Sequence, residues 1–202
     1  MDAAADLGPD PLEIFRAWLD EVVAAPLPEP MAMVLATAPA DDHAQPLARH
    51  VLLRGVDERG LAWVTNTHSR KGRHLAENPR GCLVFPWFPI HRQVIVTGPV
   101  ADADDGESDA YFATRDRESQ VAAWASDQSQ PIPDRAALES AWAEYDARFA
   151  GGSVPRPPHW RMQRLTPLAF EFWMQRPHRM HDRFLYERAE AGSPWMITRL
   201  AP

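Results

Sequence analysis

The sequence predicts a mainly antiparallel β protein with added helices, whose sheet closes into a barrel. Short apolar runs separated by turn residues fill the first half of the chain, and 20 of the 202 residues are proline. Strands and helices do not alternate as they do in a parallel sheet. The length fits one domain over residues 1–202. Within it we expect a helical insert at 104–150 and disorder at 1–9.

The first predicted element is a helix that begins after Asp10. Asp10 suits the capping position and Pro11 the first helical position. Apolar residues then recur every three or four positions until Pro26 ends the helix. The next segments read as strands, at 31–37, 47–53, 61–66, 82–87 and 93–98. A short helix from a cap at Ser69 to Asn78 separates the third strand from the fourth.

The second half of the chain turns helical and then returns to strands. Helical spacing of apolar residues runs through 104–150, where Asp134 can cap the last helix. Residues 151–158 read as a loop. Further strands are predicted at 161–167, 169–175 and 194–200.

Composition excludes several classes of protein. The 21 basic and 28 acidic residues give a net charge of −7, which argues against an extended nucleic-acid-binding surface. No apolar run is long enough to cross a membrane, and the acidic N-terminus does not resemble a signal peptide, so we expect a cytoplasmic protein. The single cysteine excludes an internal disulfide. All basic residues except Lys71 are arginine.

Common catalytic and phosphate-binding motifs are absent from the sequence. It contains neither a P-loop nor the glycine pattern of dinucleotide-binding folds, and no G-x-S-x-G nucleophile motif. His178 and His181 are three residues apart, but no carboxylate or cysteine completes a zinc site. We therefore expect no metal.

Arginine clusters are the most informative feature. On the strand RHVLLR (49–54), alternate side chains share a face, and the strand is either part of a site or a solvated edge strand. Arg70 and Lys71 begin a short helix, where cations and backbone N–H groups favour an anion; a solvated helix start is the alternative. A third cluster lies in 172–188, where the alternative is an exposed hairpin.

Several long blocks carry a resemblance to a known family. They are RHVLLR (49–54), VTNTHSRK (64–71), LVFPWFPIHRQV (83–94), YFATRDRESQVAAWASDQS (111–129) and EFWMQRPHRMHDRFLYER (171–188). In this order the chain resembles the pyridoxine/pyridoxamine 5′-phosphate oxidases, from about Asp10 to Pro202. The resemblance implies an FMN-binding split β-barrel that forms a homodimer with FMN at the interface.

The implied reaction is the oxidation of pyridoxamine 5′-phosphate, and also of pyridoxine 5′-phosphate, to pyridoxal 5′-phosphate. A hydride leaves the C4′ carbon of the substrate for flavin N5, and O2 reoxidises the flavin to give H2O2. Because FMN and substrate each bring a phosphate, such an enzyme needs two arginine-rich subsites. No nucleic acid or membrane partner is expected.

The resemblance also implies roles for individual residues. Gln128 and Ser129 are expected to contact FMN from the opposite side of the interface from the main strand, and Arg179 and His181 are the expected catalytic residues. The expected FMN-binding residues are Arg49, His50, Val51, Leu52, Leu53, Arg54, Val64, Thr65, Arg70, Lys71, Gln93, Gln128, Ser129, Trp173 and Arg183. The expected substrate-binding residues are Arg54, Tyr111, Arg115, Ser119, Arg179 and His181.

The sequence departs from the family pattern in three places. Arg54 replaces a lysine that contacts substrate, which keeps the charge and changes its shape. The usual W-G-G reads Trp160-Arg161-Met162, which removes two glycines. Few residues precede the first helix, so we expect a short N-terminal arm. Two alternatives follow: a sister oxidase of the phenazine type, and a non-catalytic FMN-binding protein.

Overall fold

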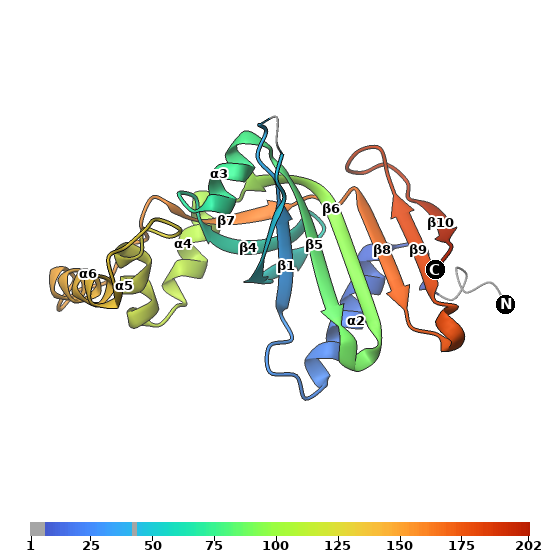
Figure 1. Ribbon diagram of the computed structural model, residues 1–202, viewed down its shortest axis with the longest axis horizontal. Coiled ribbons are helices and arrows are strands. Elements are labelled where there is room, and N and C mark those ends of the chain that lie inside the picture. Colours follow the sequence, from blue (N-terminus) through green and yellow to red (C-terminus); the bar gives the residue numbers. More distant parts are fainter. Residues whose placement is uncertain (1–6, 42–43) are drawn as a thin grey trace.

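A computed structural model describes residues 7–41 and 44–202 of the chain. An antiparallel sheet curls into a half-barrel, with one helix packed against it and three more at one end (Figure 1). The helices are α2 (Pro11–Ala24), α3 (Arg70–Glu77), α4 (Asp105–Ala113), α5 (Arg117–Ala125) and α6 (Arg135–Arg148). The strands are β1 (Ala32–Thr37), β2 (Leu47–Leu52), β3 (Gly55–Asp57), β4 (Gly60–Asn66), β5 (Arg80–Trp87), β6 (Arg92–Asp102), β7 (Trp160–Leu165), β8 (Ala169–Met174), β9 (Asp182–Glu187) and β10 (Met196–Leu200).

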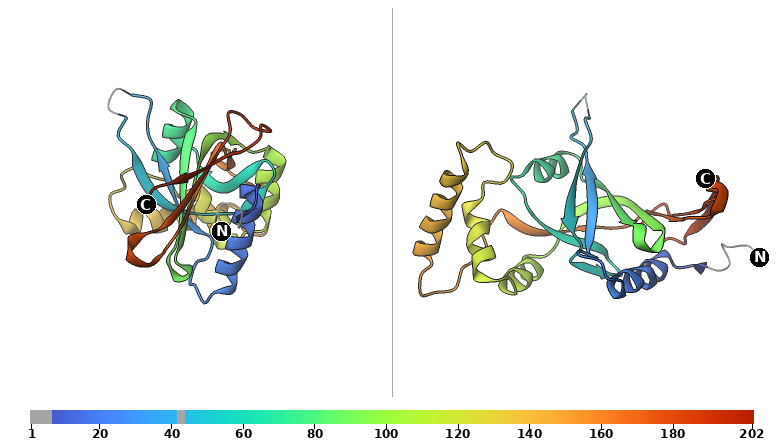
Figure 2. Two further views of the ribbon diagram at one scale, coloured as in Figure 1. Left: turned by 90° about the vertical axis from the view of Figure 1, so that its right-hand side faces the viewer. Right: turned by 60° about the horizontal axis from the view of Figure 1, so that its bottom comes forward.

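The long strand β6 organises the sheet. One edge of β6 pairs with β5 along its length, and the other edge pairs first with β8 and then with β7. Because β6 changes partner, the sheet divides. One branch continues through β8, β9 and β10, and the other turns through β7 and β4 to close most of a barrel. Figure 2 shows β8–β10 and the helical insert at opposite ends of the molecule.

The core lies between α2 and the inner face of the sheet. The Phe15 ring from α2 is 4.9 Å from that of Phe85 and 6.2 Å from that of Phe170. Trp18 packs edge-on against Phe172 at 5.2 Å. The predicted start of this helix is confirmed, since the Asp10 side chain accepts a hydrogen bond from the Leu12 N–H at 2.8 Å.

The expected antiparallel β fold with helices is confirmed, and two predicted details are wrong. The short strand β3, which the turn at 58–59 joins to β4, and the strand β9 were not predicted. In residues 182–187 charged residues flank a short run, Phe184–Tyr186, and pairing with β8 and β10 makes the whole segment a strand. The arginine-rich segment is therefore a hairpin between β8 and β9. The predicted disorder at 1–6 lies outside the described residues, whereas the Gly8 carbonyl accepts a hydrogen bond from Tyr186.

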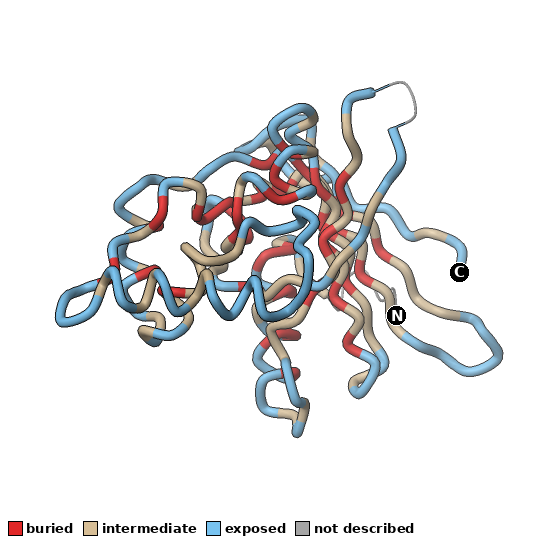
Figure 3. Tube along the Cα trace, turned by 60° about the vertical axis from the view of Figure 1, so that its left-hand side comes forward, coloured by how far each residue is buried: buried red, intermediate tan, exposed pale blue. Residues whose placement is uncertain are grey.

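The helical insert α4–α6 has its own small core. Phe112, Val121, Val154 and Trp160 are buried there, apart from the main core. No residue of α6 is buried, although helical spacing predicted an apolar face. Figure 3 shows the helical insert, at the left, mostly in the colours of exposed and intermediate residues. Trp142 and Tyr145 are only half-buried against the rest of the insert.

The outer face of the large sheet is only half-buried. Val34 on β1, Val84 on β5, Ile95 on β6 and Leu185 on β9 point away from the core and are partly exposed. Glu171 on β8 lies in the same row between Ile95 and Leu185, so the outer face is apolar across β1, β5 and β6 and carries a charge on β8. No helix in the described residues is both long and apolar enough to span a membrane.

Candidate active site

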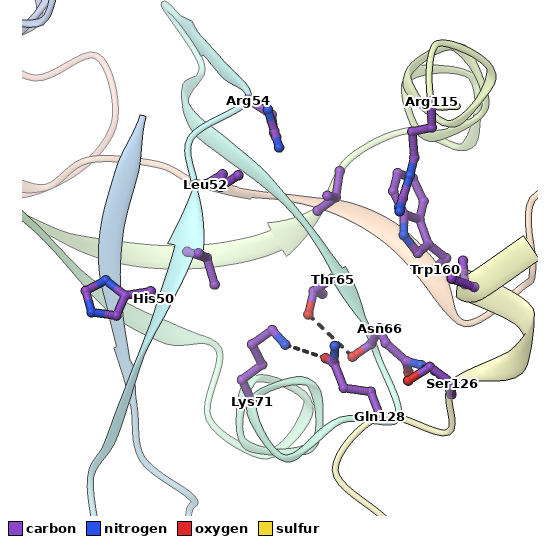
Figure 4. A pocket seen from close by; sticks show the side chains of 14 residues that line it. His50, Leu52, Arg54, Thr65, Asn66, Lys71, Arg115, Ser126, Gln128 and Trp160 are labelled. Atoms are coloured by element: carbon purple, nitrogen blue, oxygen red, sulfur yellow. Dashed lines mark hydrogen bonds between the residues drawn. The ribbon is translucent and has the colours of Figure 1, made fainter. Parts of the chain in front are cut away.

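A cavity of about 350 Å³ opens between the barrel and the helical insert. Figure 4 shows its lining side chains converging from both sides. The lining comes from β2, from Arg54 just before β3, from β4, α3 and α5, from the loops on either side of α5, and from the start of β7. The lining includes His50, Val51, Leu52, Arg54, Val64, Thr65, Asn66, Lys71, Arg115, Ser126, Gln128 and Trp160.

The local chain path explains why the cations gather here. β2 lies at one end of the strand order and is therefore an edge strand. An edge strand was one of the two interpretations of the segment RHVLLR. Ser69 caps α3, with its hydroxyl accepting from the Gly72 N–H at 3.3 Å. A Cβ on Gly72 would lie 2.2 Å from the Thr67 carbonyl oxygen, so only glycine lets the helix begin this close to β4. That approach places Arg70 and Lys71 beside the edge strand.

Arg49, Arg70 and Lys71 form the first cation group. Together with Gln128 and Ser129 they line an adjoining cavity of about 560 Å³. Arg49 donates to the Leu35 carbonyl at 3.0 Å and to the Thr37 hydroxyl at 2.8 Å. None of the ion pairs in residues 7–41 and 44–202 involves these three side chains.

Electrostatics in this first group favour a bound anion. Burial, together with the charge of Arg49, lowers the pKa of Lys71 to about 8. Burial and the charge of Arg70 also lower the pKa of Arg49. Cations held together without a carboxylate destabilise one another, and an anion would relieve this.

Arg54, Tyr111 and Arg115 form a second group at the other end of the cavity. The Arg54 guanidinium carbon is 5.8 Å from the centre of the Tyr111 ring. Burial lowers the pKa of Arg115, and the charge of Arg54 acts in the same direction. Arg115 also donates to the Ser119 carbonyl at 3.1 Å. Figure 4 shows Arg54 and Arg115 facing the cavity far from the Lys71–Gln128 hydrogen bond.

The remaining predicted residues lie elsewhere in the chain. Gln93 pairs with Trp173 across β6 and β8, and Trp173 pairs with Arg183 across β8 and β9. The His181 ring is 4.7 Å from that of Trp173. Gln93 and Trp173 line a separate cavity of about 600 Å³. Arg183 is already bonded to Glu171 at 2.8 Å.

Arg179 lies on a strained turn between β8 and β9. Both His178 (φ 56°) and Arg179 (φ 60°) have left-handed backbone conformations, which are uncommon outside glycine. The turn is closed by the Arg176 N–H, which donates to His181 Nδ1 at 3.1 Å, and by an Arg176–Asp182 ion pair of 2.6 Å. Arg179 is exposed at its tip.

One predicted residue, Leu53, lies away from the cavities. Gln128 Oε1 accepts from Lys71 Nζ of the same chain at 2.6 Å, and the expected contact of Gln128 with FMN stays a prediction. The loop after α5 folds back over α3, where Asn66 Nδ2 donates to the Ser126 carbonyl at 3.3 Å. Leu53 is 3% exposed and belongs to the main core.

Sequence reasoning assigned no role to five residues that line the cavity: Asn66, Ala122, Ala123, Ser126 and Trp160. Asn66 lies inside a block that carried the family resemblance, and Trp160 inside a noted departure from it, so both could have been found. In the described residues no group of three or more His, Cys, Asp or Glu side chains could hold a metal ion.

Comparison with known proteins decides the family. Residues 19–149 match the family model described as pyridoxamine 5′-phosphate oxidase. This chain belongs to the pyridoxamine 5′-phosphate oxidase family. Residues 160–202 match the model described as the pyridoxine 5′-phosphate oxidase C-terminal dimerisation region. The family is an FMN-binding one, and its split-barrel fold agrees with the half-barrel seen here.

Curated relatives cover nearly the whole chain. A pyridoxine/pyridoxamine 5′-phosphate oxidase from Cupriavidus necator is 53% identical over 197 residues, covering 98% of this chain and 91% of the relative. One from Burkholderia mallei is 50% identical over 200 residues, covering 98% and 92%.

Solved structures show the same fold. PhzG from Burkholderia lata, solved with tetrahydrophenazine-1-carboxylic acid, has a TM-score of 0.90 and 31% identity, covering 100% of this chain and 97% of that one. A pyridoxamine 5′-phosphate oxidase-related, FMN-binding protein from Nostoc punctiforme has a TM-score of 0.73 and 17% identity, covering 96% and 100%.

The residues present fit FMN. Its phosphate matches the first cation group, whose three charges have no carboxylate partner among the described ion pairs. The flavin ring needs an apolar wall with a few polar groups, which Val51, Leu52 and Val64 provide beside Thr65.

The pKa of Lys71 predicts how FMN affinity depends on pH. Below about pH 8 the amine is already charged and binding needs no proton. Above it, binding the phosphate requires protonation of Lys71, so affinity should fall by up to about tenfold per pH unit. Titrating FMN between pH 7.5 and 9.5 by flavin fluorescence measures this.

The matched control for the pH titration is Lys71→Arg, because arginine stays charged throughout this range. The variant should show a much flatter profile. An equally steep fall in the variant would assign the titration to another group.

Proposed function

We propose that this protein oxidises pyridoxamine 5′-phosphate, and also pyridoxine 5′-phosphate, to pyridoxal 5′-phosphate with FMN as cofactor. The observation that carries this is the pair of cation groups in two adjoining cavities, which share His50, Lys71 and Gln128 as lining residues. Arg49, Arg70 and Lys71 suit the FMN phosphate. Arg54 and Arg115, with Tyr111, suit a second phosphate on the substrate.

Positioning is the main task of the protein in this reaction. FMN held by Arg49, Arg70 and Lys71 would supply the acceptor for a hydride from C4′ of the substrate, with O2 as the final electron acceptor and H2O2 as the by-product. The two cation groups fix the phosphates, and the cavity between them sets how the two rings meet. Arg54 replaces the family lysine with a fork that can bind two phosphate oxygens at once.

A sister oxidase of the phenazine type is the second candidate. The observation that favours it is the similarity to PhzG, which was solved with a tetrahydrophenazine carboxylic acid. Against it, Arg54 and Arg115 provide two positive charges where a carboxylate brings only one negative charge. A non-catalytic FMN-binding protein would need neither this second cation group nor Arg179 and His181.

We infer that the active site forms between two copies of the chain. On the outer sheet face, register places Leu52, Gln93, Trp173 and Arg183 in one row. Three strand spacings separate Leu52 from Gln93, a distance of about 14 Å. A second copy covering the apolar outer face would bring its own β6, β8 and β9 to this cavity. The match of 160–202 to a dimerisation region supports this homodimer.

The test of the proposed function is direct. The purified protein is supplied with FMN, then pyridoxamine 5′-phosphate is added in air while pyridoxal phosphate and H2O2 are followed. Formation of both products in equal amounts supports the proposal. Turnover of tetrahydrophenazine-1-carboxylic acid alone would favour the sister oxidase, and bound FMN without any turnover would favour the binding protein. A cytoplasmic location stays a sequence-based prediction.

Substitution of Arg179 tests the catalytic assignment. Arg179→Ala should lower the oxidation rate by about tenfold or more, because a cation beside the substrate ring is lost. FMN should remain bound, since the first cation group is untouched. Single-turnover flavin reduction under anaerobic conditions measures the rate. An unchanged rate would remove Arg179 from the site.

A further inference from the structure

Arg156 joins the helical insert to the barrel. Its side chain is 10% exposed, and it bonds three groups from two directions. Nη2 contacts Asp105 Oδ1 at 2.8 Å and Nε contacts Asp109 Oδ1 at 2.5 Å, one helical turn apart on α4. Nη1 donates to the Trp160 carbonyl at 2.8 Å, where β7 begins. One planar guanidinium thus fixes the face of a helix to a strand end.

The strand end held by Arg156 touches the second cation group. The Trp160 ring lies nearly parallel to that of Tyr111, with centres 6.2 Å apart and planes at 12°. The guanidinium carbon of Arg115 is 5.1 Å from the Trp160 ring centre. Tyr111 is itself on α4, and Arg115 follows it. The spacing of Tyr111 and Arg115 from Arg54 on the barrel therefore depends on how α4 sits on β7.

Other contacts attach α4 to β7 without reaching Trp160. Arg161 bonds Asp105 at 3.1 Å and Arg164 bonds Glu107 at 2.8 Å. The Arg161 side chain points toward α4, away from the cavity lining, so the change from the family glycine adds an ion pair and leaves the cavity open.

We propose that Arg156 is a positioning residue for the anion subsite formed by Arg54, Tyr111 and Arg115. It does not line the cavity and so does not bind the anion itself. Its carboxylate partners neutralise it, while Arg54 and Arg115 keep their charge available. Loss of Arg156 lets α4 shift on β7 and weakens binding of a phosphate-bearing substrate. The identity of that substrate rests on the function proposed above.

The first test compares Arg156→Gln with Arg135→Gln. Arg135 makes an exposed ion pair with Glu139 on α6, so its loss removes the same charge without touching the subsite. For R156Q, KM for pyridoxamine 5′-phosphate should rise about tenfold to a hundredfold. The kcat should change by less than about threefold, and FMN affinity should not change, because Arg49, Arg70 and Lys71 lie on other segments. R135Q should match the unsubstituted protein.

A second readout does not depend on turnover. Inorganic phosphate is titrated into the FMN-loaded protein and followed by tryptophan fluorescence, with Trp160 in the subsite. R156Q should weaken phosphate binding about tenfold or more. If the protein fails to oxidise pyridoxamine 5′-phosphate but R156Q still weakens phosphate binding, the proposed function fails and the role of Arg156 stands. Unchanged phosphate binding in R156Q overturns the role of Arg156.

A double-mutant cycle separates positioning from general loss of stability. If Arg156 acts through Arg115, R156Q adds little to the phosphate-binding defect of Arg115→Gln. Fully additive effects overturn the proposal. Asp109→Asn provides a milder variant should R156Q not fold, because it removes one of the two negative charges that face Arg156 and leaves Asp105 in place. D109N should raise KM in the same direction by a smaller factor, and an unchanged KM counts against the proposal.

Discussion

Replacing Arg70 and Lys71 together, as Arg70→Gln and Lys71→Met, should lower FMN affinity by about a hundredfold or more. Charge-assisted hydrogen bonds to phosphate are each worth about 1.5–3 kcal/mol. Arg70 is exposed, so solvent screens its share, and the half-buried Lys71 carries the larger part. Equilibrium titration of the FMN-free protein with FMN, followed by flavin fluorescence, measures the loss.

The control for this pair is Arg73→Gln on the same helix. Arg73 is exposed and donates to the His68 carbonyl at 2.5 Å, and it lines neither cavity. Its substitution removes one positive charge from α3 and should change FMN affinity by less than about threefold. Riboflavin, which lacks the phosphate, should bind R70Q/K71M as it binds the unsubstituted protein. A parallel loss of riboflavin binding would show that the variant damages the flavin pocket rather than the phosphate clamp.

Mixing two inactive variants should restore about a quarter of the activity if each site takes residues from two subunits. One variant is R70Q/K71M. The other variant carries Gln93→Ala and Trp173→Ala. These two residues lie in the row on the outer sheet face, on the side away from Leu52. Half of randomly assembled dimers are hybrids, and each hybrid holds one intact site and one doubly damaged site. The specific rate of hydrogen peroxide formation after co-refolding measures the recovery.

The control mixture combines two variants that are damaged in the same part of the site, the part that contains Arg54, Arg70 and Lys71. R70Q/K71M mixed with Arg54→Ala should recover nothing, because no pairing yields an intact site. Recovery in this mixture would contradict a division of the site between β2–α3 on one chain and β6–β8 on another. Absence of recovery in the first mixture, with hybrids verified by two affinity tags, would place the complete site within one chain.

Local patterns predicted most of the fold. The cap at Asp10 and the cap at Ser69 both have their expected hydrogen bonds, because capping depends on neighbouring residues alone. The strand β9 escaped prediction because its run of apolar residues, Phe184–Tyr186, is short, and the charged residues on both sides join the strand through pairing with β8 and β10. Such pairing is a tertiary property that periodicity does not record.

The candidate site shows the same difference between features that are local in the sequence and features that depend on folding. Arg70 and Lys71 could be assigned to an anion from sequence, since a helix start and two adjacent cations are local features. Arg54 and Arg115 are 61 positions apart, and only folding brings both to one cavity. The resemblance to a known family supplied both, while the Lys71–Gln128 hydrogen bond became visible only in the structure. The contribution of Arg156 follows from three contacts that no linear motif contains.

The position of Lys71 has a consequence for chemical labelling. It is the only lysine of the sequence, so an acylating reagent finds a single side-chain amine, and this one is held beside the phosphate-binding cations. With a pKa of about 8, it is partly unprotonated, and so nucleophilic, in mildly alkaline buffer. Bound FMN should shield it. The mass added to one tryptic peptide would then report how many subunits are empty, without any label being introduced by mutation.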